Sequence, residues 1–169
     1  VGTLTKTKKD MLLRTAIARE SAPGEHRVAI VPETAKKFQA LGVSIQLETL
    51  SGLESHFMDG VYEGADIRAD LPQTYAGAAL ILRVTPPSLA EIEAMPEGAV
   101  LVGMLRPYED KARLAALNAR RITAFAMELL PRISRAQSMD VLSSQAACAG
   151  YQCGLIAAAR CTKFFPMLT

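Results

Sequence analysis

Charged and hydrogen-bonding side chains that could bind a ligand are concentrated near the C-terminal end of the chain, in residues 131–151. A loop with the sequence PRISRAQSMD starts there and runs directly into a segment rich in small residues. Hydrogen-bond donors and acceptors are mixed in this loop: Arg132, Arg135, Gln137, Ser138 and Asp140. Placed beside the positive end of a helix, such side chains suit a ligand with anionic or amide groups. The same residues could instead only cap the helix and brace the loop, and the residue types leave both interpretations open.

A long helix is expected to follow this loop. No proline occurs between Asp140 and Lys163, and alanine, leucine and glutamine are frequent, so about six turns are predicted. Ser138 or Asp140 is expected to cap its first turn. Small residues recur every four positions along this helix, which predicts close packing against another helix, either within this chain or outside it: Ala146, Gly150, Gly154 and Ala158.

Composition excludes several classes of protein. The 169 residues are 50% hydrophobic and 21% charged, which is typical of one folded domain rather than of a disordered chain. A net charge of +2 gives no reason to expect a nucleic-acid partner. Basic residues outnumber acidic ones nine to four between Arg106 and Lys163, which indicates either a solvated face or an edge that attracts anions. No apolar run approaches the length of a membrane span.

Cysteine and histidine usage predicts neither a disulfide framework nor a metal site. Three cysteines fall on the predicted long helix, with no C-x-x-C spacing, and there are only two histidines. We therefore expect reduced, partly buried cysteines: Cys148, Cys153 and Cys161. The motifs G-x-G and G-x-S-x-G are also absent, so neither a glycine-rich dinucleotide turn nor a hydrolase nucleophile is predicted.

Short apolar segments alternate with helical patterns before the loop. Strands are expected at 12–18, 43–47, 78–84, 99–105 and 122–126, and helices at 33–41, 88–95 and 110–119. Ser88 is expected to cap the second of these helices, and residues 48–70 to hold loops with short helical turns. The alternation predicts an α/β fold: an open, mostly parallel, flavodoxin-like or Rossmann-like sheet flanked by helices, with a long C-terminal helix that would lead to a second domain.

This pattern predicts a domain organisation in three segments. Residues 1–10 are expected to be a basic, disordered leader or tag, residues 11–138 an N-terminal α/β subdomain, and residues 139–169 the long inter-subdomain helix with a truncated linker. Arg27 and Arg83 are each expected at the mouth of a strand, where either binds a carboxylate or is an ordinary surface arginine. His26 and His56 are expected to be solvated loop residues rather than catalytic bases.

The loop also carries a resemblance. Residues 131–145, followed by Ala149-Gly150-Tyr151, resemble the corresponding motif of the proton-translocating NAD(P) transhydrogenases, alpha subunit, in the alanine dehydrogenase/transhydrogenase family. Similar segments occur at 19–32, 82–84 and 164–165, so the resemblance covers nearly all of residues 12–169. The loop motif is long enough to be specific, whereas the other segments alone would also suit alanine dehydrogenases.

This resemblance implies the first half of an NAD(H)-binding domain I, with the glycine-rich Rossmann half beginning after Thr169. The loop would reach toward the nicotinamide and the adjacent ribose, with Gln137 as the catalytic candidate that positions the nicotinamide. The implied nucleotide-binding residues are Arg132, Gln137, Asp140, Ser143 and Tyr151. No metal is implied.

The activity implied is hydride transfer between NADH and NADP⁺, coupled to proton movement. NADP(H) would bind a partner subunit, and the implied partners are the missing Rossmann half of domain I and the membrane and NADP(H)-binding domains. A homodimer and a cytoplasmic location, peripheral to the inner membrane, are implied as well. The chain alone is expected to be inactive and to bind NAD(H) weakly or not at all, because the glycine-rich turn and the ribose-binding acid are absent.

Two positions depart from alanine dehydrogenases, which resemble this chain but carry lysine where Arg83 stands and histidine where Arg106 stands. The lysine and histidine handle the keto acid there, so oxidative deamination is not expected here. Arg83 also departs from the lysine usual in transhydrogenases, which leaves its role open. The alternative hypotheses are an alanine dehydrogenase-like oxidoreductase and a non-catalytic module that assembles through its long helix.

Overall fold

A computed structural model of the chain describes residues 13–163. It contains two compact units, one that extends to Ala126 and one that begins at Met127. The predicted leader, the residue expected to begin the first strand and the 164–165 segment lie outside the described residues. The predicted domain limits of 11–138 and 139–169 remain predictions.

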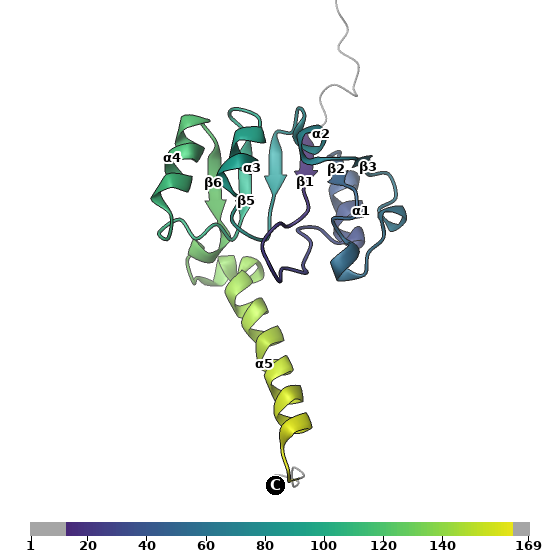
Figure 1. Cartoon of the computed structure of the whole chain (residues 1–169), viewed down its shortest axis with the longest axis vertical. Helices are drawn as coiled ribbons and strands as arrows, with labels where there is room; N and C mark the ends of the chain where they lie inside the picture. Colours follow the sequence, from purple (N-terminus) through teal and green to yellow (C-terminus); the bar gives the residue numbers. More distant parts are fainter. Residues whose placement is uncertain (1–12, 164–169) are drawn as a thin grey trace, which may run out of the picture. The chain divides into compact units, whose positions relative to one another are not determined.

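Six strands form one sheet in the first unit, and every pair of neighbours is parallel. The strands lie in the order β3-β2-β1-β4-β5-β6 (Figure 1). They are β1 (Arg14–Ile17), β2 (Ser44–Glu48), β3 (Asp66–Arg68), β4 (Leu80–Leu82), β5 (Val100–Gly103) and β6 (Thr123–Ala126). The order reverses direction between β1 and β4, as in a Rossmann-like sheet, so the predicted fold class is confirmed.

Four α-helices connect the strands of this unit. They are α1 (Pro32–Ala40), α2 (Leu71–Tyr75), α3 (Leu89–Ala94) and α4 (Lys111–Ala119). Short 3₁₀ turns occur at η2 (Leu53–Ser55) and η3 (Asp59–Val61). Ser88 caps α3 in a reciprocal capping box with Glu91, and Asp110 caps α4, so both predicted helices begin where the cap residues indicate.

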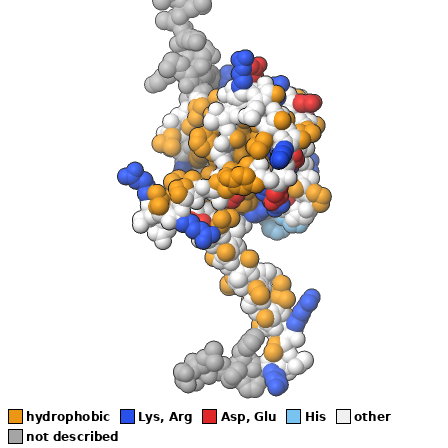
Figure 2. Space-filling model, turned by 90° about the vertical axis from the view of Figure 1, so that its left-hand side faces the viewer, with side chains coloured by type: hydrophobic (Ala, Val, Ile, Leu, Met, Phe, Trp, Pro, Cys, Tyr) orange, Lys and Arg blue, Asp and Glu red, His pale blue; other side chains and the backbone are white. Residues whose placement is uncertain are grey.

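Two hydrophobic clusters cover opposite faces of the sheet. Ile81 and Leu101 pack with residues of α2, α3 and α4 on one face, whereas Ile17 and Leu47 pack beneath Ala35 of α1 on the other. Figure 2 shows the side of this unit that carries α4 and β6, where many hydrophobic side chains reach the surface.

The second unit consists of η4 (Met127–Leu129), η5 (Ser134–Met139) and α5 (Val141–Arg160). The long helix is therefore confirmed, although it ends at Arg160 rather than at Lys163. Of the two predicted caps, Asp140 is the one that accepts from the helix, through the N–H of Ser143. No helix in the described residues is long and apolar enough to cross a membrane.

Three sequence predictions differ from the structure. The segment 48–70 contains the strand β3 besides the expected turns, because a three-residue edge strand with one apolar residue, Ile67, carries no apolar run. The short helix α2 was not predicted. The cysteines Cys148, Cys153 and Cys161 are free but exposed rather than partly buried, and no residue of α5 is buried.

Candidate functional site

The loop that precedes α5 folds around one small buried side chain. Ala136, only 6% exposed, lies within the 3₁₀ turn η5, which begins after Ile133 and ends before Asp140. The N–H of Asp140 donates to the carbonyl oxygen of Gln137 at 3.4 Å, which holds the end of the turn against the start of the helix. The loop is thereby shaped by contacts between residues that are close in sequence.

This loop encloses a hollow of about 320 Å³ within the second unit. Four of the five predicted nucleotide-binding residues line it: Arg132, Gln137, Asp140 and Ser143. The other lining residues are Leu130, Pro131, Ile133, Ser134 and Ala136. The structure therefore brings a guanidinium, an amide, a carboxylate and a hydroxyl group together in the lining of one hollow.

Tyr151, the fifth predicted residue, does not belong to the lining. It lies eight residues beyond Ser143 on α5, about 12 Å along the helix axis, and is 72% exposed. Arg135 and Ser138 of the same loop are exposed and lie outside the lining as well.

Asp140 both caps α5 and lines the hollow. Its Oδ1 accepts from the N–H of Ser143 at 3.0 Å, and its Oδ2 accepts from the Ser143 hydroxyl at 2.6 Å. These hydrogen bonds, assisted by the charge of Arg132, lower the pKa of the Asp140 carboxyl below its ordinary value. An ionised carboxylate thus occupies the positive end of α5, which favours a ligand that donates hydrogen bonds over one that brings a phosphate to this point.

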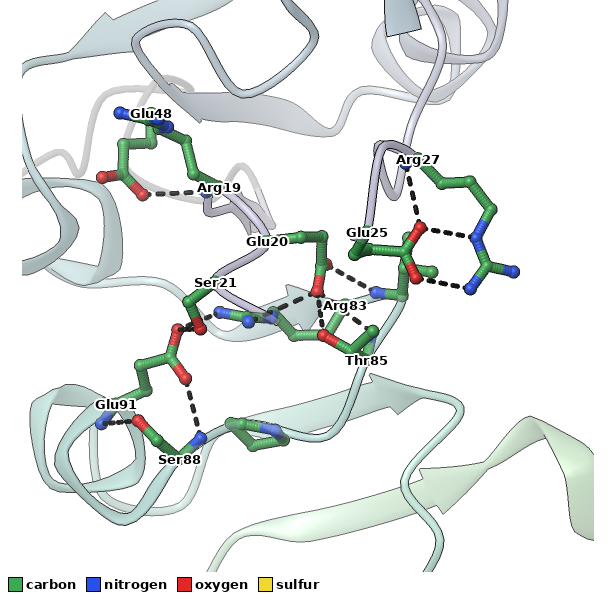
Figure 3. A network of polar contacts seen from close by, with 12 residues as sticks. Arg19, Glu20, Ser21, Glu25, Arg27, Glu48, Arg83, Thr85, Ser88 and Glu91 are labelled. Atoms are coloured by element: carbon green, nitrogen blue, oxygen red, sulfur yellow. Dashed lines mark hydrogen bonds and ion pairs between the residues drawn. The ribbon is translucent and has the colours of Figure 1, made fainter. Parts of the chain in front are cut away.

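A second polar cluster lies at the carboxyl ends of β1 and β4 in the first unit (Figure 3). The Arg83 side chain is fully buried, with Nη1 2.8 Å from Glu91 Oε1 and Nη2 3.3 Å from Glu20 Oε2. Glu20 also accepts from the backbone N–H groups of Val84 and Thr85 at 2.7 and 3.0 Å and from the Thr85 hydroxyl. The interpretation of Arg83 as a surface arginine is wrong, because two internal carboxylates bind it.

This cluster favours the ionised form of Glu91. Burial disfavours the charged form of Glu91, but hydrogen bonds from Ser88 and the charge of Arg83 outweigh it, so the pKa of Glu91 lies below its ordinary value. Crevices at the strand-order reversal of Rossmann-like sheets commonly bind ligands. Here Glu20 and Glu91 balance the charge of Arg83, so Arg83 offers no free cation to a small carboxylate ligand.

Arg27 and His26 have ordinary roles in the loop after β1. The guanidinium of Arg27 pairs with both carboxylate oxygens of Glu25, at 2.7 Å from Nε and 2.5 Å from Nη2. His26 is exposed, with Nδ1 3.1 Å from Glu54 Oε2, which agrees with a solvated loop residue.

Sequence reasoning missed the Glu20–Arg83–Glu91 cluster. The available signal was the position of Arg83, next to the nearly uninterrupted apolar run of β4, since a charge buried beside a central strand needs partners. Glu91 is eight residues away and Glu20 is 63 residues away, so the partners could not be named from local pattern.

The fold agrees with comparisons to known proteins. The family model "Alanine dehydrogenase/PNT, N-terminal domain" matches residues 16–149. The chain belongs to this family. Within it, the chain is 40% identical over 163 residues to an NAD(P) transhydrogenase alpha-subunit chain of Rhodospirillum rubrum, a match that covers 92% of this chain and 42% of the relative.

Solved structures and more distant relatives agree with this assignment. The crystal structure of transhydrogenase from Sinorhizobium meliloti matches with a TM-score of 0.85 and 42% identity, over 92% of this chain and 47% of that chain. Alanine dehydrogenase of Methanococcus maripaludis is 29% identical over 79% of this chain and 36% of its own length. The chain spans less than half the length of these relatives.

Proposed function

We propose that this chain supplies one half of an NAD(H)-binding domain in a proton-translocating NAD(P) transhydrogenase. The observation that carries the proposal is the hollow before α5, where Arg132, Gln137, Asp140 and Ser143 converge at the positions of the motif that resembles transhydrogenases. The similarity to transhydrogenase alpha chains over 92% of this sequence supports the same assignment.

The volume and chemistry of the hollow suit a portion of a dinucleotide. About 320 Å³ lies at the lower end of the range for small-molecule sites, enough for a nicotinamide with its ribose but not for a whole dinucleotide. The amide of Gln137 offers a donor and an acceptor to a carboxamide, and the carboxylate of Asp140 accepts from hydroxyl groups. A pyrophosphate would need donors from elsewhere, because Asp140 already occupies the helix end.

The residues of this chain would therefore position a reactant rather than exchange protons with it. When bound, the nicotinamide ring supplies or receives the hydride, and hydride transfer depends on orientation and on the exclusion of water. Gln137 would hold the plane of the carboxamide, while Asp140 and Ser143, already hydrogen-bonded to each other, would fix the ribose. Arg132 lies beside this pair and balances the charge of Asp140.

The complete enzyme requires partners that this chain does not contain. We place the glycine-rich half of the NAD(H) site, the NADP(H)-binding domain and the proton-conducting membrane domain elsewhere in the complex. This chain itself would lie on the cytoplasmic side, peripheral to the inner membrane. A homodimer of the alpha subunit belongs to the same proposal. This chain alone would lack hydride-transfer activity.

An alanine dehydrogenase activity is disfavoured by the cluster around Arg83. A keto-acid substrate needs a free cation, whereas Arg83 is 0% exposed at its side chain and is paired with Glu20 and Glu91. Turnover of pyruvate with ammonia, assayed beside reduction of an NADP⁺ analogue in the assembled protein, separates the two activities. Turnover of pyruvate alone would refute the transhydrogenase assignment.

The direct test is a titration with NADH. The 169-residue chain is expected to give no saturable signal below millimolar concentration, and adding the Rossmann half is expected to produce saturable binding. Tight binding by this chain alone would contradict the proposal that it holds only half of the site. Absence of binding after addition of the other half would contradict the assignment of the hollow.

A further inference from the structure

One row of side chains along the 3₁₀ turn η5 lines the hollow before α5. Side chains three positions apart in a 3₁₀ helix lie on the same side of it, about 6 Å apart along its axis. Ser134, Gln137 and Asp140 have this spacing, and all three belong to the lining. The residues that follow the first two, Arg135 and Ser138, are exposed and lie outside the lining. The period of the turn therefore groups Ser134 with two of the predicted nucleotide-binding residues.

The Ser134 hydroxyl is not engaged by the rest of the second unit. It makes no hydrogen bond with any residue in the range 13–163. The other hydroxyl of the lining is already used, because Ser143 Oγ donates to Asp140 Oδ2 at 2.6 Å. Asp140 Oδ1 accepts from the N–H of Ser143. Ser134 therefore offers a hydroxyl oxygen that a ligand can use without breaking a contact within the chain.

The side chain of Gln137 can satisfy only part of a ligand carboxamide. A carboxamide has one oxygen that accepts hydrogen bonds and an NH₂ group with two N–H donors. An amide–amide pair with Gln137 uses the carboxamide oxygen and one of these two N–H groups. The second N–H then needs another acceptor, because a donor that is left unmatched on binding lowers the affinity.

The spacing of the row suits Ser134 as this second acceptor. Two oxygens that accept from the same NH₂ group lie about 5 Å apart, because each N···O distance is about 2.9 Å and the two N–H bonds diverge by about 120°. Ser134 and Gln137 are separated by about 6 Å along the turn. The two side-chain oxygens can therefore reach one ligand nitrogen from the same side of η5.

We propose that Ser134 is a specificity-determining residue of the hollow, whose hydroxyl oxygen accepts the second N–H of a nicotinamide carboxamide. This inference rests on the proposed function, because the carboxamide belongs to the nicotinamide that Gln137 binds. Ser134 and Gln137 together fix the direction in which the carboxamide points. They also select it over an acetyl or carboxylate group, since neither of these groups has an N–H donor.

A nucleotide analogue without the NH₂ group tests this proposal. NADH and the reduced 3-acetylpyridine analogue, in which a methyl group replaces the NH₂ group, are titrated into the protein assembled with the Rossmann half. The Kd of each ligand is measured for the unmodified protein, for Ser134→Ala and for Ser134→Thr. Ser138→Ala is the matched control, because Ser138 belongs to the same turn but lies outside the lining.

The expected result is a roughly tenfold higher Kd for NADH in Ser134→Ala, while the Kd for the analogue changes by less than about twofold. Ser134→Thr keeps a hydroxyl, so it should retain the preference for NADH over the analogue, as should Ser138→Ala. An unchanged Kd for NADH in Ser134→Ala, or an equal rise for both ligands, would overturn the proposal. Loss of the preference in Ser138→Ala or in Ser134→Thr would overturn it as well.

The same titrations separate this inference from the proposed function. Saturable NADH binding that Ser134→Ala leaves unchanged would refute the role of Ser134 but leave the proposed function intact. Absence of saturable NADH binding in the unmodified assembled protein would refute both.

Discussion

The Arg83 guanidinium lies 2.8 Å from the Glu91 carboxylate in the interior of the first unit. Glu91 meanwhile accepts from Ser88 at the start of α3, so the same carboxylate joins the end of β4 to a helix cap. Ser21, in the loop after β1, also donates to Glu91, at 3.1 Å. The Glu91 carboxylate therefore connects this loop to β4 and α3.

Removing the cation from this cluster should be costly. Arg83→Met leaves two carboxylates buried without their partner, and we expect the free energy of unfolding to fall by about 3–5 kcal/mol. Urea denaturation of the chain measures this loss. Arg121→Met is the matched control, because Arg121 pairs with Glu97 at the surface with 81% of its side chain exposed, and it should change stability by less than about 0.5 kcal/mol. Similar effects of the two substitutions would contradict a structural role for the cluster.

Acid should weaken the same contact. The pKa of Glu91 is lower in the folded state than its ordinary value of 4.5, so its stabilising contribution is complete above about pH 4.5 and is lost as the pH falls through the lowered pKa. We expect Glu91→Gln to flatten the decrease of the urea midpoint below about pH 4.5. Glu93→Gln, at an exposed position of the same helix α3, is the control. An equally steep decrease in Glu91→Gln and in the unmodified chain would show that other carboxyl groups cause it.

The two polar clusters differ in how far the sequence could predict them. Arg132, Gln137, Asp140 and Ser143 lie within twelve positions, so one loop and one helix cap bring them together through local contacts. Glu20 reaches Arg83 only through the pairing of β1 with β4, which depends on the whole sheet. Tyr151 belongs to the same sequence motif but does not line the hollow, because it lies eight helical residues beyond Ser143. A sequence motif alone therefore does not show which of its residues share a site.

The helices and strands also differ in whether local sequence or distant contacts determine them. The caps Ser88, Asp110 and Asp140 are local signals, and the three helices begin beside them. The strand β3 depends on pairing with β2 rather than on its own sequence, which is why the pattern of Asp66–Arg68 did not indicate it. Its stability comes from non-local contacts that a local pattern does not encode.

Asp140 allows its capping role to be separated from ligand binding. Asparagine caps a helix about as well as aspartate, so Asp140→Asn should leave the first turn of α5 intact while it removes the charge. Asp140→Ala should speed amide exchange in that turn by roughly five- to tenfold, because the hydrogen bond to the Ser143 N–H is lost. Hydrogen exchange of the 169-residue chain measures both variants.

The same pair of variants tests the nucleotide role in the assembled protein. If the carboxylate accepts from the ribose, Asp140→Asn should weaken NADH binding by roughly tenfold despite an intact helix. Unchanged binding in Asp140→Asn, with loss only in Asp140→Ala, would assign Asp140 to capping alone.

Gln137 provides the sharpest test of positioning. Gln137→Asn keeps the amide but withdraws it by one methylene, and in the assembled protein we expect hydride transfer to slow by roughly 10–100-fold while the Kd for NADH changes by less than about threefold. Single-turnover transfer to an NADP⁺ analogue and equilibrium titration measure the two effects separately. Arg135→Gln is the control, because Arg135 belongs to the same turn but does not line the hollow. Since a merely structural glutamine would affect neither rate nor affinity once the fold is intact, an unchanged transfer rate in Gln137→Asn would assign Gln137 to the loop rather than to the reaction.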